Sequence, residues 1–150
     1  MSNPPGPQFI FDEWHNRIKA RDGEGLSKLY ARDAVLESPL VPRVLDTDTG
    51  ALHGHEAISH FLLEITMRRP GEDELPSLFR TGKYFWDGHT LIWEYPRSTP
   101  DGNQLDLVEV MEIDESLITY HRIYWGWVGT EHLLNNAVAK HETSPQRAAR

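Results

Sequence analysis

The chain has 150 residues, with 15 Lys and Arg against 23 Asp and Glu, and it contains no cysteine. Its length predicts one domain over residues 1–150. The acidic balance argues against nucleic-acid binding, which needs clustered Lys and Arg. The lack of cysteine excludes disulfides and fits a cytoplasmic protein. No run of about 18 apolar residues suggests a membrane span, and the N-terminus MSNPPGPQ lacks the pattern of a signal peptide.

The first half of the chain predicts helices around one short strand. Hydrophobic spacing indicates the following elements in chain order: helices at 9–18 and 26–30, a strand at 34–38 and a helix at 54–69. Residues 1–7 are rich in Pro and Gly and are expected to be flexible. Residues 39–52 hold two prolines and a glycine without a clear period, so we predict a loop that could serve as a lid or a binding loop.

The second half predicts a meander of antiparallel strands. The expected strands are 77–86, 89–96, 104–114 and 117–128. Asp87-Gly88 is a strong hairpin signal, and a tight turn is expected near Glu115-Ser116. A terminal helix is predicted over 130–140, capped by Thr130, with a flexible tail at 141–150. The order of elements predicts an α+β fold, in which a curved sheet carries helices on one face.

One acid interrupts the apolar pattern of the strand LVEVMEID. Glu109 shares a face with Leu107, Met111 and Ile113, whereas Glu112 points to the other face. Pairing the last two strands with Ile113 opposite Leu117 would place His121 directly opposite Glu109. The same register sets Met111 opposite Thr119, Leu107 opposite Ile123 and Leu105 opposite Trp125. A slip of one residue would reverse the faces, so the register decides this contact.

A carboxylate beside an imidazole on an apolar wall has two interpretations. Burial favours the neutral form of the carboxyl group, whereas an imidazolium beside it favours the anion. Either effect could give a group suited to proton transfer. The structural alternative is a buried hydrogen-bonded pair in a core or a dimer interface, although a buried pair is costly to keep for stability alone. Both interpretations stay open at the level of the sequence.

Three motifs in order resemble the nuclear transport factor 2-like superfamily, most of all its SnoaL-like and ketosteroid isomerase-like branches. They are LYARDAVLESP, GHEAISHFL and VEVMEIDESLITYHRIYW, and the likeness runs from about Phe9 to Trp127. The resemblance implies a cone-shaped α+β fold, with a mixed and largely antiparallel sheet wrapped around N-terminal helices. It also implies an apolar pocket for a small hydrophobic molecule and a homodimer through the sheet. Members include enzymes and non-enzymatic binding domains, so the fold alone leaves the function open.

The resemblance carries over to individual positions only in part. Glu109 matches the strand acid that hydrogen-bonds the substrate oxygen in ketosteroid isomerases. In those enzymes the apolar site keeps this acid protonated, so that it can donate the hydrogen bond. Trp125 matches a pocket-lining tryptophan, and Trp14 lies within one residue of a helix tyrosine that donates to the same oxygen. Ser38 stands where the general base is an aspartate, and Gly126 stands roughly where many SnoaL-like proteins carry another acid. Both usual bases are therefore missing.

Without those bases, ketosteroid isomerase activity is not expected, because a serine is too weak a base to enolise a ketone unaided. His121, poised by Glu109, is the best remaining base. Scytalone dehydratase-like members use histidine and acid chemistry in this fold, which implies that elimination of water is a plausible reaction. Trp14 and Ser38 would then orient a substrate oxygen. The competing hypothesis is a non-catalytic module that binds a hydrophobic ligand or dimerises.

The remaining candidates have ordinary structural alternatives. Tyr84, Trp93 and Met111 are expected on the pocket wall as substrate-binding residues, although aromatic strand residues are more often core. His53, His55 and His60 invite a metal interpretation, but no carboxylate pattern completes a zinc motif, and exposed or helix-capping histidines are favoured. We therefore expect no metal. Nothing resembles a phosphate-binding loop, and no cofactor is expected.

Overall fold

The computed structural model describes residues 5–68, 83–95 and 107–131. Its helices are α1 (Pro7–Lys19), α2 (Gly23–Ser27), α3 (Val41–Leu45) and α4 (His55–Met67). Its strands are β1 (Tyr30–Glu37), β2 (Ala51–His53), β3 (Phe85–Trp86), β4 (Thr90–Tyr95), β5 (Leu107–Asp114) and β6 (Leu117–Trp125). The parts of predicted elements at 77–82, 96, 104–106 and 132–140, and the termini 1–4 and 141–150, lie outside the described residues.

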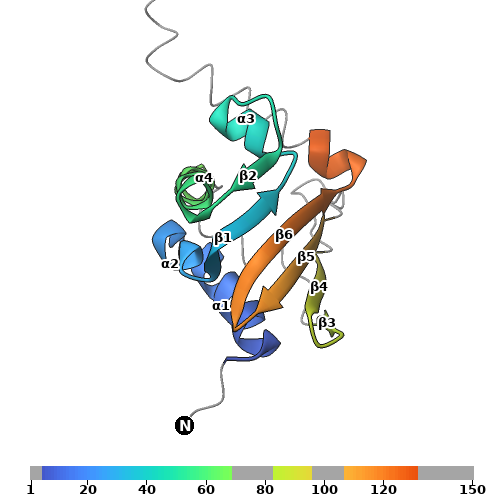
Figure 1. The fold of residues 1–150 in the computed structure, drawn as a ribbon. Helices are drawn as coiled ribbons and strands as arrows, with labels where there is room; N and C mark the ends of the chain where they lie inside the picture. Colours follow the sequence, from blue (N-terminus) through green and yellow to red (C-terminus); the bar gives the residue numbers. More distant parts are fainter. Residues whose placement is uncertain (1–4, 69–82, 96–106, 132–150) are drawn as a thin grey trace, which may run out of the picture.

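The strands form one curved sheet in the order β2-β1-β6-β5-β4-β3 (Figure 1). β1 runs parallel to β6, and the other neighbouring pairs are antiparallel. In Figure 1, α1 passes behind β1 and β6, and α4 lies on the same side of the sheet. The predicted α+β architecture, a mixed sheet wrapped around N-terminal helices, is therefore confirmed.

The hydrophobic core lies between this helical layer and the inner face of the sheet. α1 contributes Ile10, Trp14 and Ile18 at helical spacing, because residues three or four apart share one face of a helix. The strands contribute every second residue, as the alternating burial of β5 shows. Within the described residues, no helix combines the length and the hydrophobicity that crossing a membrane requires.

Tertiary pairing overrides local preference in two places. Tyr30 was predicted in the second helix, but α2 ends at Ser27 and Tyr30 begins β1. The backbone N–H of Ile118 on β6 donates to the carbonyl of Leu29, 2.8 Å away, which draws this segment into the sheet. The predicted loop at 39–52 likewise contains α3 and the start of β2, because β2 pairs with the end of β1.

The turn between β5 and β6 lies where the sequence predicts it, but the predicted register of the two strands is wrong. Asp114 pairs with Leu117 across Glu115 and Ser116, and a bulge then leaves Thr119 without a partner in the ladder. Beyond the bulge Met111 faces His121, and Leu107 faces Trp125. The predicted partners on β6 are thus displaced by two residues from the observed ones. Because two residues is one full strand period, every side chain keeps its face.

The chain also differs from the prediction just after this hairpin. β6 ends at Trp125 rather than continuing to residue 128, and the helical conformation begins at Trp127 rather than after Thr130. The backbone N–H of Thr130 donates to the carbonyl of Gly126, 3.0 Å away. Thr130 therefore lies inside the first turn instead of capping it.

A double substitution in the turn of this hairpin is expected to stabilise the protein. Glu115 and Ser116 have φ angles of 46° and 67°, a left-handed conformation that glycine adopts freely and that most other residues, apart from Asn and Asp, adopt at a cost. Replacing them by Asn and Gly, the preferred pair for such a turn, should raise the free energy of unfolding by about 1 kcal/mol. Chemical denaturation measures this change. Ser116→Val should lower the same free energy, and a double variant no more stable than the parent would contradict the assignment.

Candidate functional site

Glu109 lies in the middle of the inner face of the sheet. On β5 it is directly opposite Trp93 of β4 and Ile123 of β6. Its exposed fraction is only 4%, and one carboxylate oxygen, Oε2, hydrogen-bonds to Nε2 of the fully buried His121. The two residues are diagonal neighbours across the hairpin, a separation that long side chains bridge. The predicted contact of Glu109 with His121 is therefore present, although they do not stand directly opposite each other.

A third residue extends this pair into a chain of hydrogen bonds. The hydroxyl of Tyr30, the first residue of β1, lies 2.7 Å from Nδ1 of His121. Tyr30, His121 and Glu109 come from three adjacent strands, β1, β6 and β5. Sequence reasoning missed Tyr30 because it was assigned to a helix. The available signal was its bulk beside a predicted strand, since a buried tyrosine usually needs a partner for its hydroxyl.

The two contacts of His121 determine what the imidazole can do. An ionised carboxylate only accepts hydrogen bonds, so Nε2 must donate its hydrogen to Glu109 when that acid is charged. In the neutral ring Nδ1 then accepts a hydrogen bond from the Tyr30 hydroxyl. Both ring nitrogens are engaged in this arrangement. His121 therefore has no nitrogen directed at a ligand, whereas Glu109 retains its second oxygen, Oε1.

Aromatic side chains from α1 and β4 enclose this chain. The ring of Trp14 meets the imidazole of His121 edge-on, with centroids 5.1 Å apart. Trp93 is fully buried and packs against Phe11 and His15, each with centroids 5.4 Å away. A wall of this kind excludes water, which strengthens polar interactions within it.

His15 is a second buried histidine that the sequence did not single out. Its ring lies against Phe11, and its Nδ1 hydrogen donates to the carbonyl of Phe11, 2.6 Å away. The spacing of four residues along α1 explains this bond. His15 therefore serves the local structure of the helix.

The predicted pocket residues Met111, Tyr84 and Trp125 lie in the hydrophobic core or pack against it. Met111 is fully buried on the inner face beside His121, and Tyr84 is half-buried against Phe11, with ring centroids 5.2 Å apart. Trp125 packs against the core from the end of β6, and its indole Nε1 is buried without a hydrogen-bond partner in the described part of the chain. This nitrogen is a donor that a ligand oxygen could use.

Ser38 has a local role in the structure. Its hydroxyl oxygen accepts a hydrogen bond from the backbone N–H of Leu40, 3.2 Å away, and its carbonyl accepts one from Val41. These bonds shape the turn between β1 and α3. Ser38 also lines an open groove of about 440 Å³ together with Glu37, Arg122 and other residues. Nothing in these contacts makes Ser38 a base.

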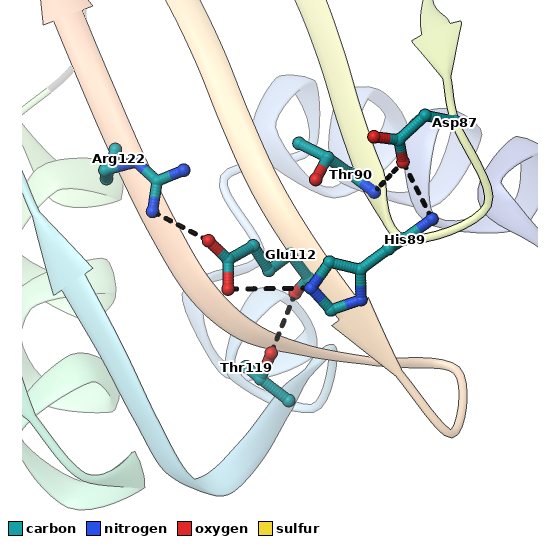
Figure 2. Close-up of polar contacts among 6 residues, drawn as sticks. All are labelled: Asp87, His89, Thr90, Glu112, Thr119 and Arg122. Atoms are coloured by element: carbon teal, nitrogen blue, oxygen red, sulfur yellow. Dashed lines mark hydrogen bonds and ion pairs between the residues drawn. The ribbon is translucent and has the colours of Figure 1, made fainter.

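The outer face of the sheet carries a separate polar network (Figure 2). Glu112 lies between Arg122, with Nη1 3.0 Å from Oε1, and His89, with Nε2 3.7 Å from Oε2. The bulge residue Thr119 donates from its hydroxyl to the carbonyl of Glu112, 3.1 Å away. Since these groups are partly exposed, water screens them and their contribution to stability is small.

Two residues at the edges of this outer network have shifted pKa values. A hydrogen bond to the Glu37 carboxylate, together with burial, raises the pKa of Tyr120. At the β3–β4 turn, the backbone amides of Thr90 and His89 lower the pKa of Asp87 by donating to its carboxylate (Figure 2). Neither residue lies on the inner face, so both shifts belong to the structure of the sheet rather than to the candidate site.

The histidines near α4 do not form a metal centre. His55 donates from Nε2 to the carbonyl of Ser27, 2.9 Å away, and its Nδ1 accepts from the hydroxyl of Ser59. This histidine thus links α4 to α2. His53 and His60 are exposed. Within the described ranges, no three His, Cys, Asp or Glu side chains are close enough to hold an ion together.

Known structures with the same arrangement of helices and strands clarify the fold. No protein-family model matches the sequence, and no curated protein matches it. A SnoaL-like protein of unknown function from Burkholderia thailandensis is similar, with a TM-score of 0.62 and 16% identity over 80% of this chain and 93% of that chain. A steroid delta-isomerase from Pseudomonas aeruginosa has a TM-score of 0.60 and 19% identity over 95% of this chain and 97% of that chain.

An NTF2-like protein of unknown function from Cytophaga hutchinsonii is also similar, with a TM-score of 0.55 and 11% identity over 84% of this chain and 95% of that chain. At such identities the likeness establishes the fold. The chain therefore has the nuclear transport factor 2-like fold that its motifs resemble. Because neighbours with this fold include proteins of unknown function, the activity has to be argued from the site.

The hydrogen-bond chain predicts unequal effects of two substitutions on stability. His121→Phe leaves a buried carboxylate and a buried hydroxyl without their partner, and it should lower the free energy of unfolding by about 3 kcal/mol. Glu109→Gln keeps an acceptor for Nε2 and should lower it by about 1 kcal/mol or less. Urea denaturation of both variants tests this order. Equal losses would show that Glu109 and His121 do not share a buried bond.

Proposed function

We propose that the chain is a small-molecule enzyme in which Glu109 transfers protons through its second carboxylate oxygen. The observation that carries this proposal is the buried Glu109, held at Oε2 by His121 and free at Oε1 of hydrogen bonds to the described residues. A carboxylate fixed in this way on an apolar wall is oriented before the substrate arrives. His121 then orients Glu109 by donating to Oε2. The sequence suggested the reverse, with His121 as the base and Glu109 as the residue that positions it.

Proton abstraction next to a carbonyl group is the reaction that this geometry supports best. Glu109 would take a proton from carbon, the electrons of the C–H bond would move to the carbonyl oxygen, and an enolate would form. Trp125 lies on the same face, and its unpartnered indole N–H would donate to that oxygen. Returning the proton to another carbon completes an isomerisation. In a cyclisation the enolate carbon would attack a second carbonyl group of the substrate, and Glu109 would return the proton to the alkoxide that forms. Loss of hydroxide, protonated to water, completes a dehydration.

The walls of the site indicate the class of substrate. Trp14, Trp93 and Met111 are almost completely buried and offer hydrophobic surface. Only a few polar groups accompany them, which is typical of sites for small hydrophobic molecules with one or two oxygens. We therefore propose a lyase of the dehydratase type, or an isomerase or cyclase, acting on a hydrophobic oxygenated substrate.

A non-catalytic binding module is the second candidate. Ser38, at the position of the usual base, is engaged in a turn, and both nitrogens of His121 are engaged in hydrogen bonds. Among the described residues of the site, Glu109 is then the group left for proton transfer, and in a binding protein the same carboxylate would simply accept a hydrogen bond from a ligand. The two candidates differ in what happens when Glu109 loses its charge.

The enzyme proposal predicts that Glu109→Gln separates turnover from binding. Ligand binding can be found by tryptophan fluorescence with a panel of cyclic ketones and hydroxyketones, and turnover of the ligands that bind can be followed by chromatography. The variant should still bind but lose at least about 100-fold in turnover, because an amide cannot accept the proton. Met67→Gln on the exposed side of α4 is a control that should keep both properties.

Two results would contradict this proposal. Turnover that survives Glu109→Gln would remove Glu109 from the reaction. Tight binding without any turnover by the parent protein, across ligands that carry an acidic C–H bond, would favour the binding module.

We also propose that the chain forms a homodimer through the outer face of the sheet. Hydrophobic side chains on that face are half-buried or exposed: Val35, Ile92, Val108, Val110, Tyr120 and Tyr124. They surround the acidic Glu37 and Glu112 and the basic Arg122, so two copies related by a two-fold axis could place opposite charges together.

The proposed dimer predicts that a charge placed in the middle of the outer face of the sheet disrupts the assembly. Val110 lies directly opposite Ile92 and Arg122, and Val110→Arg would bury like charges in the dimer. The parent chain should elute as a dimer and the variant as a monomer when size-exclusion chromatography is combined with light scattering. Met67→Arg on α4 should leave the dimer intact. A monomeric parent chain would contradict the assembly.

A further inference from the structure

Tyr30 contacts the site but has no part in the chemistry proposed above. It is 3% exposed, and its hydroxyl lies 2.7 Å from Nδ1 of His121. It enters the sheet opposite Ile118, and the register between β1 and β6 then shifts before Val35. This irregularity sets Tyr30 apart from the regular part of β1. The ring of Trp14 packs against Tyr30 and His121, with centroids 6.2 Å and 5.1 Å away, and limits the movement of both.

We propose that Tyr30 is a positioning residue that holds the His121 imidazole at Nδ1, in the tautomer that Glu109 requires, and so keeps Glu109 oriented as a hydrogen-bond acceptor. The consequence for catalysis rests on the proposed function, whereas the tautomer itself can be observed in the free protein. Tyr30 acts through the imidazole between it and Glu109.

The physical argument concerns where the single proton of a neutral imidazole lies. With the proton on Nε2, the ring donates to Glu109 and accepts from Tyr30, so all three groups are satisfied. With the proton on Nδ1, the lone pair of Nε2 would face the lone pairs of the carboxylate, and Glu109 would lose its donor. Glu109 selects the first state, and the Tyr30 hydroxyl holds the ring in it by supplying a hydrogen to Nδ1. A phenylalanine would leave Nδ1 in an apolar enclosure without a donor.

A tautomer that is fixed in this way also holds the carboxylate in one orientation. The hydrogen on Nε2 binds Oε2 of Glu109, which leaves Oε1 without a hydrogen bond to the described residues. If the ring lost its contact at Nδ1, it could turn about its side-chain bonds, and Glu109 would lose its anchor for part of the time. Proton transfer requires a closely defined geometry, so this loss would lower turnover more than ligand binding.

Nitrogen NMR of the imidazole side chains tests this proposal directly. In protein labelled with ¹⁵N-histidine, the His121 signals can be assigned by their disappearance in His121→Gln. The parent protein should show an unprotonated Nδ1 and a protonated Nε2. Tyr30→Phe should move the Nδ1 signal, because Nδ1 loses its hydrogen-bond donor, whereas Nε2 stays protonated against Glu109. Tyr120→Phe is a matched control, because it removes a hydroxyl that bonds Glu37 on the outer face, and it should leave the His121 signals unchanged.

The outcomes separate this inference from the proposed function. A parent protein with Nδ1 protonated, or unchanged His121 signals in Tyr30→Phe, would overturn the role of Tyr30 even if the enzyme is active. The NMR result stands even if no turnover is found. Where a substrate is known, Tyr30→Phe should lower kcat about tenfold, as expected for one hydrogen bond, with little change in KM. A rise in KM at constant kcat would contradict the positioning role.

Tyr30→Phe keeps the ring and its packing, but a second measurement covers the case in which the variant does not fold. Incorporation of 3-fluorotyrosine makes the phenol a stronger donor without removing it. The Nδ1 signal of His121 should then shift, both in the parent sequence and in Tyr120→Phe. An unchanged Nδ1 signal would show that Tyr30 does not donate to His121.

Discussion

A buried carboxylate needs a hydrogen-bond donor, and in this protein His121 satisfies that need for Glu109. The requirement reaches beyond the pair, because the imidazole that donates from Nε2 needs a partner for Nδ1, which Tyr30 provides. Three neighbouring strands are thereby linked on the face that the helices cover. The same bonds that hold the strands together leave one carboxylate oxygen without a partner among the described residues, and the proposed chemistry depends on that oxygen.

The two faces of the hairpin carry similar residues in different surroundings. On the outer face Glu112 meets Arg122 and His89, all partly exposed, and water screens their charges. On the inner face Glu109 and His121 are enclosed by tryptophans, where each unpaired polar group would be costly. Burial, rather than the type of residue, separates a surface network from a candidate site.

The departures from the usual pattern of bases have a consistent structural consequence. Ser38 belongs to a turn, and Gly126 lies where the chain leaves the sheet for a helical turn. In the proposed function the acid–base group is Glu109, at the position where the ketosteroid isomerases that the sequence resembles carry a donor to the substrate oxygen. A neighbouring histidine that donates to Glu109 suits a proton acceptor instead, so the same fold could support a different division of roles.

The sequence by itself determined the fold, the turn at Glu115 and the oddness of Glu109, because hydrophobic alternation, turn residues and motif order are local properties. It also placed Glu109 and His121 on one face. Only the tertiary structure decided the pairing of Asp114 with Leu117 and the bulge at Thr119, each of which moved the register by one residue, and the pairing that drew Tyr30 out of its predicted helix and into β1. These outcomes depend on contacts between distant segments, which local patterns do not contain. For the same reason the sequence identified the pair, and the fold supplied the third member and showed that both imidazole nitrogens are engaged.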